Sequence, residues 1–380
     1  MVRFGIVGIG SMGSSYCGWL TEGKIPGGTL AAVCDTAAER RHWARENLPS
    51  GTAIFEDAEA LFSSGLVDAV MIVTPHYFHP PLATSALEHG LHVLVDKPAG
   101  VYAGQIRQMN EAAARHPGQR FAMMFNQRTN PLYRRLKAIL DAGEIGEIRR
   151  VNWLITSWWR THKYYASSPW RATWWGEGGG VLVNQAPHQL DLLQWLCGMP
   201  CRARGYLKYG SHRRITVEDD VTAYFEYPNG ATGVLVTCTH DAVGSDRLEI
   251  QGDRGKIIVE NSSDAVIRRM SKPEDVLSEE LDFRQMLAIV KGQGGEKLYE
   301  EETFSFPEHW DIQHIDVMKN FVGSIENGEA LIAPGSEGIR AVEISNALHL
   351  SSWLGEMVEL PVDEALFYGK LQEKIAEEKR

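Results

Sequence analysis

Several features are scarce in this chain, and each scarcity excludes a class of protein. The 380 residues include five cysteines, an odd and scattered number that suits reduced thiols rather than a disulfide framework. Two of the cysteines lie close together, but no second Cys or His cluster accompanies them, so we predict no metal centre. The five are Cys17, Cys34, Cys197, Cys201 and Cys238.

Long apolar runs and positive charge are also lacking. No window approaches the roughly eighteen apolar residues of a membrane-spanning helix, and the start MVRFGIVGIG has none of the features of a signal peptide. A formal net charge of −11 opposes binding to nucleic acids and acidic membranes. We therefore expect a soluble, cytoplasmic protein that has neither nucleic acid nor membrane as a partner.

The chain has the length of two globular domains and begins with a dinucleotide-binding pattern. Val2 to Val7 is typical of a buried parallel strand, and GIGSMG follows it directly. Its glycines permit a tight turn, approach to a pyrophosphate and close helix packing, while the helix from Ser11 to Glu22 directs its amides at the phosphates. We predict that the turn binds the cofactor through Gly8, Gly10, Ser11, Met12 and Gly13.

An acidic residue indicates which dinucleotide binds. The apolar strand from Leu30 to Cys34 ends at Asp35, where a carboxylate accepts hydrogen bonds from the adenosine ribose hydroxyls, and this favours NAD. Arg40 and Arg41 lie close enough in sequence to pair with a 2′-phosphate, so NADP remains open. Asp35 could instead serve only as the cap of the next helix.

Strands and helices then alternate, which predicts a doubly wound parallel sheet, a Rossmann domain, over residues 1–125. The predicted strands are Asp68–Val73, His92–Val95 and Arg120–Phe125, and the helices are Pro80–His89 and Gly104–Arg115. Ligands of such sheets bind beyond the carboxyl ends of the strands, where this chain carries polar residues. We predict cofactor contacts from Thr74, Pro75, His76, His79, Asp96, Lys97, Asn126 and Arg128.

These motifs together resemble the Gfo/Idh/MocA family of oxidoreductases. The resemblance rests on GIGSMG with Asp35, TPHYFH, DKP, NQR, GEGGGVLVNQAPHQLDLLQWLCG and the closing GSEGIRAVEISNALHLSSWLGEMVELP. It implies a second domain over residues 126–380, a large, mostly antiparallel open sheet with helices on one face that binds substrate and pairs subunits into a homodimer or homotetramer. Strands are expected at Glu147–Ser157, Val217–Tyr227, Ala231–Thr239, Arg247–Gly252 and Lys256–Glu260, with a hairpin turn at Pro228-Asn229-Gly230.

The resemblance also implies an activity, namely hydride transfer between NAD(P) and a secondary hydroxyl or ketone of a sugar, sugar derivative or cyclitol. Such chemistry needs a base for the hydroxyl proton. The family's lysine and histidine correspond to Lys97 and His188, and Asn184 stands where many members carry an aspartate. Asparagine supplies no negative charge, so either the substrate is held differently or the role of the acid moves to Asp191 or Glu177.

Six of the eleven tryptophans lie between Trp153 and Trp175. Aromatic faces stack on sugar rings, so we predict that this segment is the substrate loop. The alternative is that these aromatic residues fill the space between the sheet and a partner subunit. The predicted substrate-binding residues are Lys97, Arg128, Tyr164, Trp174, Asn184, His188 and Asp191.

Two other functions remain open at this point, namely redox-neutral, NAD-dependent glycoside cleavage and a non-catalytic dinucleotide sensor. Retention of Lys97 and His188 argues against the sensor, and Asn184 argues weakly for it. Residues 261–307 are predicted to form a peripheral insertion with a flexible loop at Lys291–Lys297 and an edge strand at Tyr299–Phe306. The tail after Phe367 is predicted to form at most a short charged helix.

Overall fold

The computed structural model describes residues 1–293, 297–307 and 309–379 and contains two sheets. The first is a parallel sheet of six strands in the order β3-β2-β1-β4-β5-β6, which confirms the predicted Rossmann fold. Apolar residues of β1, β4 and β5 are buried, as expected of strands covered on both faces. The strands are β1 (Val2–Val7), β2 (Gly28–Cys34), β3 (Ala53–Phe55), β4 (Ala69–Ile72), β5 (His92–Val95) and β6 (Phe121–Met123).

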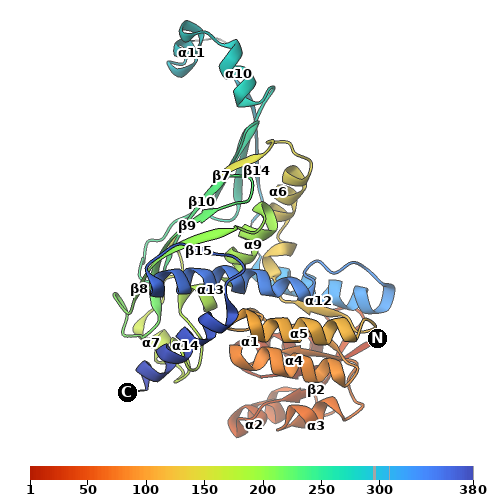
Figure 1. Cartoon of the computed structure of the whole chain (residues 1–380). Helices are drawn as coiled ribbons and strands as arrows, with labels where there is room; N and C mark the ends of the chain where they lie inside the picture. Colours follow the sequence, from red (N-terminus) through yellow and green to blue (C-terminus); the bar gives the residue numbers. More distant parts are fainter. Residues whose placement is uncertain (294–296, 308, 380) are drawn as a thin grey trace.

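Helices connect these strands and cover the sheet (Figure 1). They are α1 (Ser11–Thr21), α2 (Ala38–Asn47), α3 (Ala58–Phe62), η1 (His76–Phe78), α4 (His79–Glu88) and α5 (Ala103–Arg115). After β6 the chain forms η2 (Asn126–Thr129) and α6 (Pro131–Asp141). The side chain of Asn130 accepts a hydrogen bond from the backbone N–H of Leu132, and Pro131 occupies the first turn, so α6 begins with two favourable signals.

The second sheet has nine strands in the order β14-β13-β12-β11-β7-β10-β9-β8-β15. Its described pairs are antiparallel except for β7 with β10, so the predicted, mostly antiparallel sheet is confirmed. The strands are β7 (Ile148–Ile155), β8 (Arg202–Tyr209), β9 (Glu218–Glu226), β10 (Thr232–Cys238), β11 (Asp246–Gly252), β12 (Gly255–Glu260), β13 (Asp264–Met270), β14 (Tyr299–Ser305) and β15 (Val358–Glu359).

The remaining helices of the body lie against one face of this sheet or against the Rossmann sheet (Figure 1). They are α7 (His162–Tyr165), α8 (Val181–Asn184), α9 (Pro187–Cys197), α12 (Trp310–Asn327), η3 (Gly335–Glu337), α13 (Gly338–Leu354) and α14 (Glu364–Glu378). Helix α12 packs on the Rossmann sheet, where the rings of Phe321 and Phe4 lie 6.2 Å apart. Although its residues lie within the predicted second domain, α12 contributes to the core of the first.

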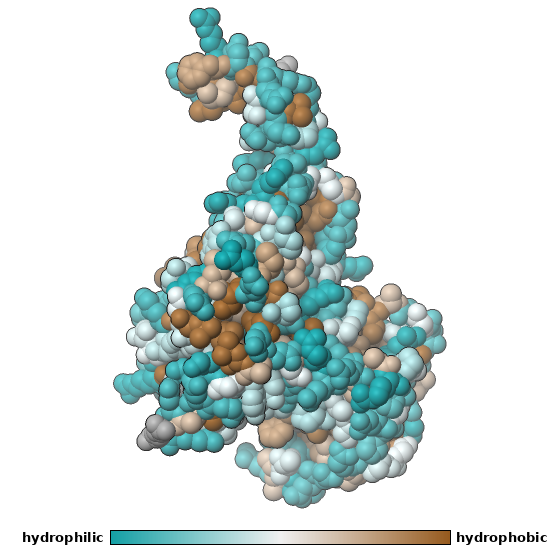
Figure 2. Space-filling view, viewed as in Figure 1, coloured by the Kyte–Doolittle hydropathy of each residue, from teal (hydrophilic) through white to brown (hydrophobic). Residues whose placement is uncertain are grey.

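The predicted insertion forms a projecting arm. Helices α10 (Glu274–Glu280) and α11 (Phe283–Val290) follow β13 and extend away from the body of the molecule (Figure 1). Apolar side chains of α11 face solvent at the end of the arm (Figure 2), with Phe283 71% and Val290 74% exposed. Strand β14 lies at the edge of the sheet as predicted. Residues 294–296, in the predicted loop Lys291–Lys297, lie outside the described residues.

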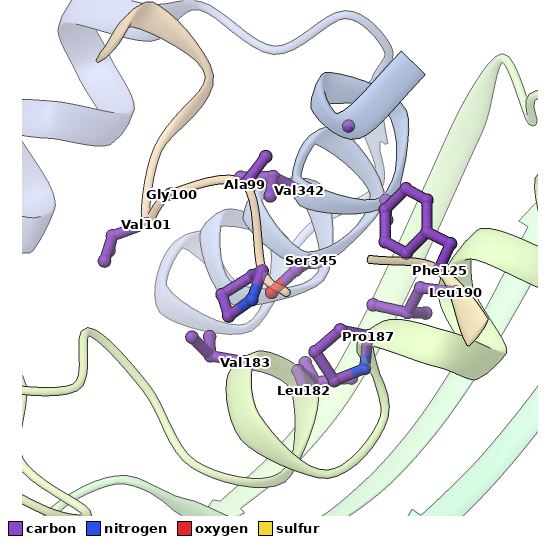
Figure 3. Close-up of a pocket in the computed structure, with 13 residues that line it drawn as sticks. Ala99, Gly100, Val101, Phe125, Leu182, Val183, Pro187, Leu190, Val342 and Ser345 are labelled. Carbon is purple, nitrogen blue, oxygen red and sulfur yellow. The ribbon is translucent and has the colours of Figure 1, made fainter. Parts of the chain in front are cut away.

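The loop after β5, helices α8 and α9, and α13 meet in an apolar contact (Figure 3). Ala99, Val101, Leu182 and Val342 line it, and the space they leave is about 10 Å³, which is too small for a ligand. This packing fixes α8 and α9 beside the Rossmann sheet. None of the described helices has the length and apolar character needed to cross a membrane.

Candidate active site

In the glycine turn between β1 and α1, the backbone of Gly13 packs directly against the backbone of Gly8. Gly8 has φ of +94°, which favours glycine, and a Cβ built on Gly13 would lie 1.9 Å from the carbonyl oxygen of Gly8. In contrast, a Cβ on Gly10 would meet no described atom within 4 Å, so this glycine faces open space. The turn therefore keeps its backbone accessible at the N-terminus of α1, where a pyrophosphate binds in such folds.

Asp35 is oriented at the end of β2 by two backbone amides. Its carboxylate oxygens accept hydrogen bonds from the N–H groups of Ile9 (2.8 Å) and Ala37 (2.9 Å). Arg40 donates to the Ile9 carbonyl oxygen (2.6 Å), and Arg41 donates to the carbonyl oxygens of Asp35 and Thr36. Both arginines thus already have acceptors within the protein, and the arrangement favours a free ribose hydroxyl over a 2′-phosphate.

A cavity of about 560 Å³ extends from this turn along the carboxyl ends of the strands. Most of the residues predicted to bind the cofactor line it, namely Gly8, Gly10, Ser11, Met12, Asp35, Thr74, Pro75, His76, His79, Asp96 and Lys97. Gly13 lies directly beneath the turn. Trp170 and Arg171, from the tryptophan-rich segment, line the cavity as well.

A second cavity, of about 580 Å³, lies between the end of β5 and the nine-stranded sheet. Its lining is polar and aromatic and includes Gln127, Trp158, Arg160, Gln185, His188, Gln189, Trp310 and His314. Met12, Asp96, Lys97 and Asn184 line both cavities. The two cavities therefore meet at the side chains of Lys97 and Asn184.

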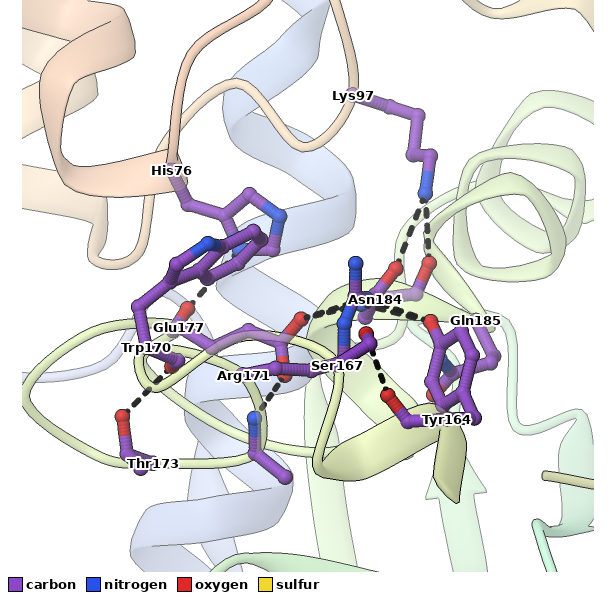
Figure 4. Close-up of polar contacts among 11 residues, drawn as sticks. His76, Lys97, Tyr164, Ser167, Trp170, Arg171, Thr173, Glu177, Asn184 and Gln185 are labelled. Carbon is purple, nitrogen blue, oxygen red and sulfur yellow. Dashed lines mark hydrogen bonds and ion pairs between the residues drawn. The ribbon is translucent and has the colours of Figure 1, made fainter. Parts of the chain in front are cut away.

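Lys97 projects from the end of β5 toward α8 (Figure 4). Its Nζ donates to the backbone carbonyl oxygen of Asn184 at 2.7 Å and lies 3.5 Å from the side-chain Oδ1 of the same residue. Burial lowers the pKa of Lys97, and the negative charges of Asp96 and Glu177 oppose that shift. Burial also raises the pKa of Asp96, to about 6.

His188 lies in the first turn of α9 and faces the second cavity. Its Nδ1 is buried and has no hydrogen-bond partner among the described residues. Burial, with the positive charge of Lys97, lowers the pKa of His188 well below its ordinary value. The neutral imidazole can accept a proton. Asn184 ends α8, so a break in the helix separates it from His188, and the two share a cavity rather than one continuous helical face.

Glu177 lies behind Asn184 and is 1% exposed. One carboxylate oxygen accepts a hydrogen bond from the side-chain amide of Asn184, and the other accepts one from the backbone N–H of Ala172 at 2.6 Å. Burial raises the pKa of Glu177 to about 7, and the Ala172 hydrogen bond and the Arg171 guanidinium counter that shift. The side-chain amide of Asn184 thus lies between the buried carboxyl group of Glu177 and the ammonium group of Lys97.

Comparison with known protein families agrees with this arrangement. The family model described as "Oxidoreductase family, NAD-binding Rossmann fold" matches residues 2–124, and the model described as "GFO/IDH/MocA C-terminal domain" matches residues 133–258. The chain belongs to the Gfo/Idh/MocA family. It is accordingly an oxidoreductase whose N-terminal domain binds NAD, as the motifs predicted.

The chain is only distantly similar in sequence to individual members of the family. It is 27% identical over 348 residues to "uncharacterized oxidoreductase YdgJ" of Escherichia coli (strain K12), covering 90% of this chain and 94% of that protein. Its match to inositol 2-dehydrogenase of Corynebacterium glutamicum (strain R), at 27% identity, spans 52% of this chain and 54% of that protein. The WlbA dehydrogenase from Bordetella pertussis, solved with NADH and UDP-GlcNAcA, has a TM-score of 0.77 at 24% identity, covering 95% and 99% of the two chains.

The described residues fit NAD. The open face of Gly10 and the oriented Asp35 would hold the pyrophosphate and ribose, and the close packing of Gly13 beneath Gly8 keeps the turn in place. His79 lies between the carbonyl oxygens of Thr74 and Pro98, at 2.6 and 2.7 Å, and so fixes the wall of the cavity.

The structure places several predicted site residues away from both cavities. Arg128 and Asp191 form a buried pair, Asn126 donates to Gln313 on α12 at 3.0 Å, and Trp174 packs edge-on against Trp353. Tyr164 does not line either cavity, but its hydroxyl accepts a hydrogen bond from Arg171 at 2.7 Å. The tryptophan segment therefore divides, because part of it lines the cavities and part of it fills the core.

Some lining residues were not identified from the sequence. Trp310 and His314 come from α12, far along the chain, and no motif marks them. Arg160 and Trp158 lie in the segment predicted to be the substrate loop, although Trp158 was not named individually as a binding residue. Gln185 and Gln189 flank the His188 motif, and their position beside it was the available signal.

Proposed function

We propose that this protein oxidises a secondary hydroxyl of a sugar, sugar derivative or cyclitol, or reduces the corresponding ketone, with NAD(H). The observation that carries the proposal is that a cavity for the dinucleotide and a polar, aromatic cavity meet at Lys97 and Asn184. Relatives named as inositol 2-dehydrogenases support a polyhydroxylated ring as the substrate class. Trp158 provides an apolar face for such a ring, and Arg160 and Gln189 provide hydrogen-bond donors.

Lys97 and His188 divide the proton chemistry in this proposal. NAD, when bound, supplies the hydride acceptor at its nicotinamide C4. The Lys97 ammonium donates a hydrogen bond to the reacting oxygen, while the neutral His188 accepts the hydroxyl proton. Asn184 holds Lys97 through its backbone carbonyl oxygen. In reduction, His188 returns the proton to the oxygen.

The first test is the absorbance at 340 nm with NAD and, separately, with NADP, against monosaccharides, glycosides, uronic acids and inositols. We expect one ring type to reduce NAD. Lys97→Ala should lower kcat by at least about 100-fold, since it removes the charged hydrogen-bond donor to the reacting oxygen, while the Kd for NAD stays within about threefold. Full activity in that variant contradicts the role of Lys97.

Two results of the same panel would contradict the dehydrogenase proposal. Glycoside cleavage without any change at 340 nm would favour the redox-neutral reaction. Cofactor binding with neither reaction would favour the sensor. The panel therefore separates the three functions that the motifs left open.

A further inference from the structure

Glu177 is a buried carboxyl group that the proposed proton transfers do not use. It lies between the tryptophan-rich segment and α8, where its side chain contacts the Asn184 amide, the Ala172 N–H and the Arg171 guanidinium (Figure 4). Burying a carboxylate is unfavourable unless hydrogen bonds and positive charge compensate. Such compensated, buried acids are frequent at functional sites.

The contacts of Glu177 fix the orientation of the Asn184 side chain. Above its pKa of about 7, the Glu177 carboxylate can only accept hydrogen bonds, so the Nδ2 of Asn184 then faces Glu177. The Oδ1 of Asn184 is then turned toward the Nζ of Lys97, 3.5 Å away. Figure 4 shows the resulting line from Glu177 through Asn184 to Lys97.

We infer that Glu177 is a positioning residue that supplies, across the Asn184 amide, the negative charge that faces Lys97. This inference rests on the proposed function of Lys97. Asp191, the other acid near the motif, is bound in a bidentate pair to Arg128 and does not line either cavity.

The charge on Glu177 acts on the protonation of Lys97. A negative charge stabilises the ammonium form and so raises the pKa of Lys97, in opposition to burial. The positive charges of Arg160 and Arg171 act the other way. The groups that face or couple to Lys97 are Asp96 after β5, His76 in η1, His79 in α4, Arg160, Arg171 and Glu177 in the segment before α8, His188 in α9 and His314 in α12.

The test measures the protonation of Lys97 without any substrate. The intact protein is treated with acetic anhydride over a range of pH, and mass spectrometry follows acetylation of Lys97, which only the neutral amine undergoes. Glu177→Gln keeps the shape of the side chain but removes its charge. We expect the acetylation midpoint of Lys97 to fall by about 0.5 to 1 pH unit.

Returning the charge at the neighbouring position should reverse this change. In the double variant Glu177→Gln/Asn184→Asp, the midpoint should return to the value of the unmodified chain or exceed it, because the new carboxylate lies beside Lys97. Glu343→Gln is the matched control, since Glu343 is a partly buried carboxyl group on α13 outside both cavities. The control should leave the midpoint unchanged.

An unchanged midpoint in Glu177→Gln would overturn the inference and leave Glu177 a purely structural group. If Glu177→Gln does not fold, the Lys97 midpoint of the double variant is compared with that of Asn184→Asp alone. The inference requires Glu177 to raise the midpoint in the Asn184→Asp background too. Failure of the dehydrogenase proposal is seen separately, in the substrate panel. Where a substrate is found, kcat should fall about tenfold in Glu177→Gln and recover in the double variant.

Discussion

Arg128 shows how one residue can fit a binding motif and still serve the core. The NQR motif placed it at a strand end, among the predicted contacts to cofactor and substrate. In the structure it is 1% exposed and donates two hydrogen bonds to Asp191, at 2.8 and 2.6 Å. The Glu337 carboxylate accepts a third hydrogen bond from the Arg128 guanidinium. With its donors occupied, Arg128 links η2, α9 and η3 instead of facing a cavity.

This pair gives a prediction about stability. Asp191→Asn should lower the free energy of unfolding by about 3 kcal/mol, because it leaves a buried guanidinium without its bidentate partner. Urea denaturation measures the change. Asp316→Asn is the control, since it removes an exposed ion pair with Lys319 and should cost less than about 1 kcal/mol. A stable Asp191→Asn protein that binds substrate weakly would instead favour the binding role.

At the scale of elements, the sequence predicted those strands and helices whose pattern is local. The apolar runs of β1, β4 and β5 were found within a residue or two of their ends, as were β7, β9, β10, β11 and β12 in the second sheet. Three-residue β3 and partly exposed β8 carry too little apolar contrast to stand out. Helix α6 could have been found, because Asn130 caps it and Leu132, Leu136 and Ile139 recur on one face.

What local patterns do not encode is the partner of each element. The apolar face of α12 predicts burial but not its packing on β1, more than 300 residues earlier in the chain. For that reason Trp310 and His314 could not be assigned to the second cavity from the sequence. Likewise, the tail helix α14 is longer than expected, and the Glu378 carboxylate at its end accepts hydrogen bonds from the backbone N–H groups of Trp174 and Trp175.

The turn between β1 and α1 provides a prediction at this scale, because two of its glycines have different surroundings. Gly13→Ala places a Cβ against the backbone of Gly8, so α1 must shift, and both stability and NAD binding should fall. Gly10→Ala places a Cβ in the open cavity. Its stability should change by less than about 0.5 kcal/mol, while its Kd for NAD should rise at least about tenfold, because the pyrophosphate approaches there.

Urea denaturation and calorimetric titration with NAD separate these two effects. Gly18→Ala is the control within the same helix, since its Cβ would meet only the end of the Glu22 side chain, at 3.8 Å. It should keep the affinity for NAD and gain up to about 1 kcal/mol of stability from helix propensity. Unchanged affinity in Gly10→Ala would show that the cofactor does not approach this glycine.

At the scale of the whole molecule, the nine-stranded sheet has two unlike faces. Trp153 and Leu235 point to the helices and are buried, whereas the alternate positions Leu154 and Val234 on the same strands are 41% and 36% exposed. Tyr206, on β8, is 60% exposed. A face that carries apolar side chains in the middle of a large sheet is typical of a surface that another subunit covers.

We therefore predict that two copies associate through this outer face. Leu154→Lys/Val234→Lys should convert the oligomer to a monomer in sedimentation velocity, because two lysines per subunit would be desolvated in an interface of about 800 Å² per partner. NAD affinity should remain, since neither residue lines a cavity. Leu66→Lys is the control, an equally exposed apolar residue on the Rossmann part. A double-lysine variant that sediments like the unmodified protein would place the interface elsewhere, and the projecting α11 would be the next surface to substitute.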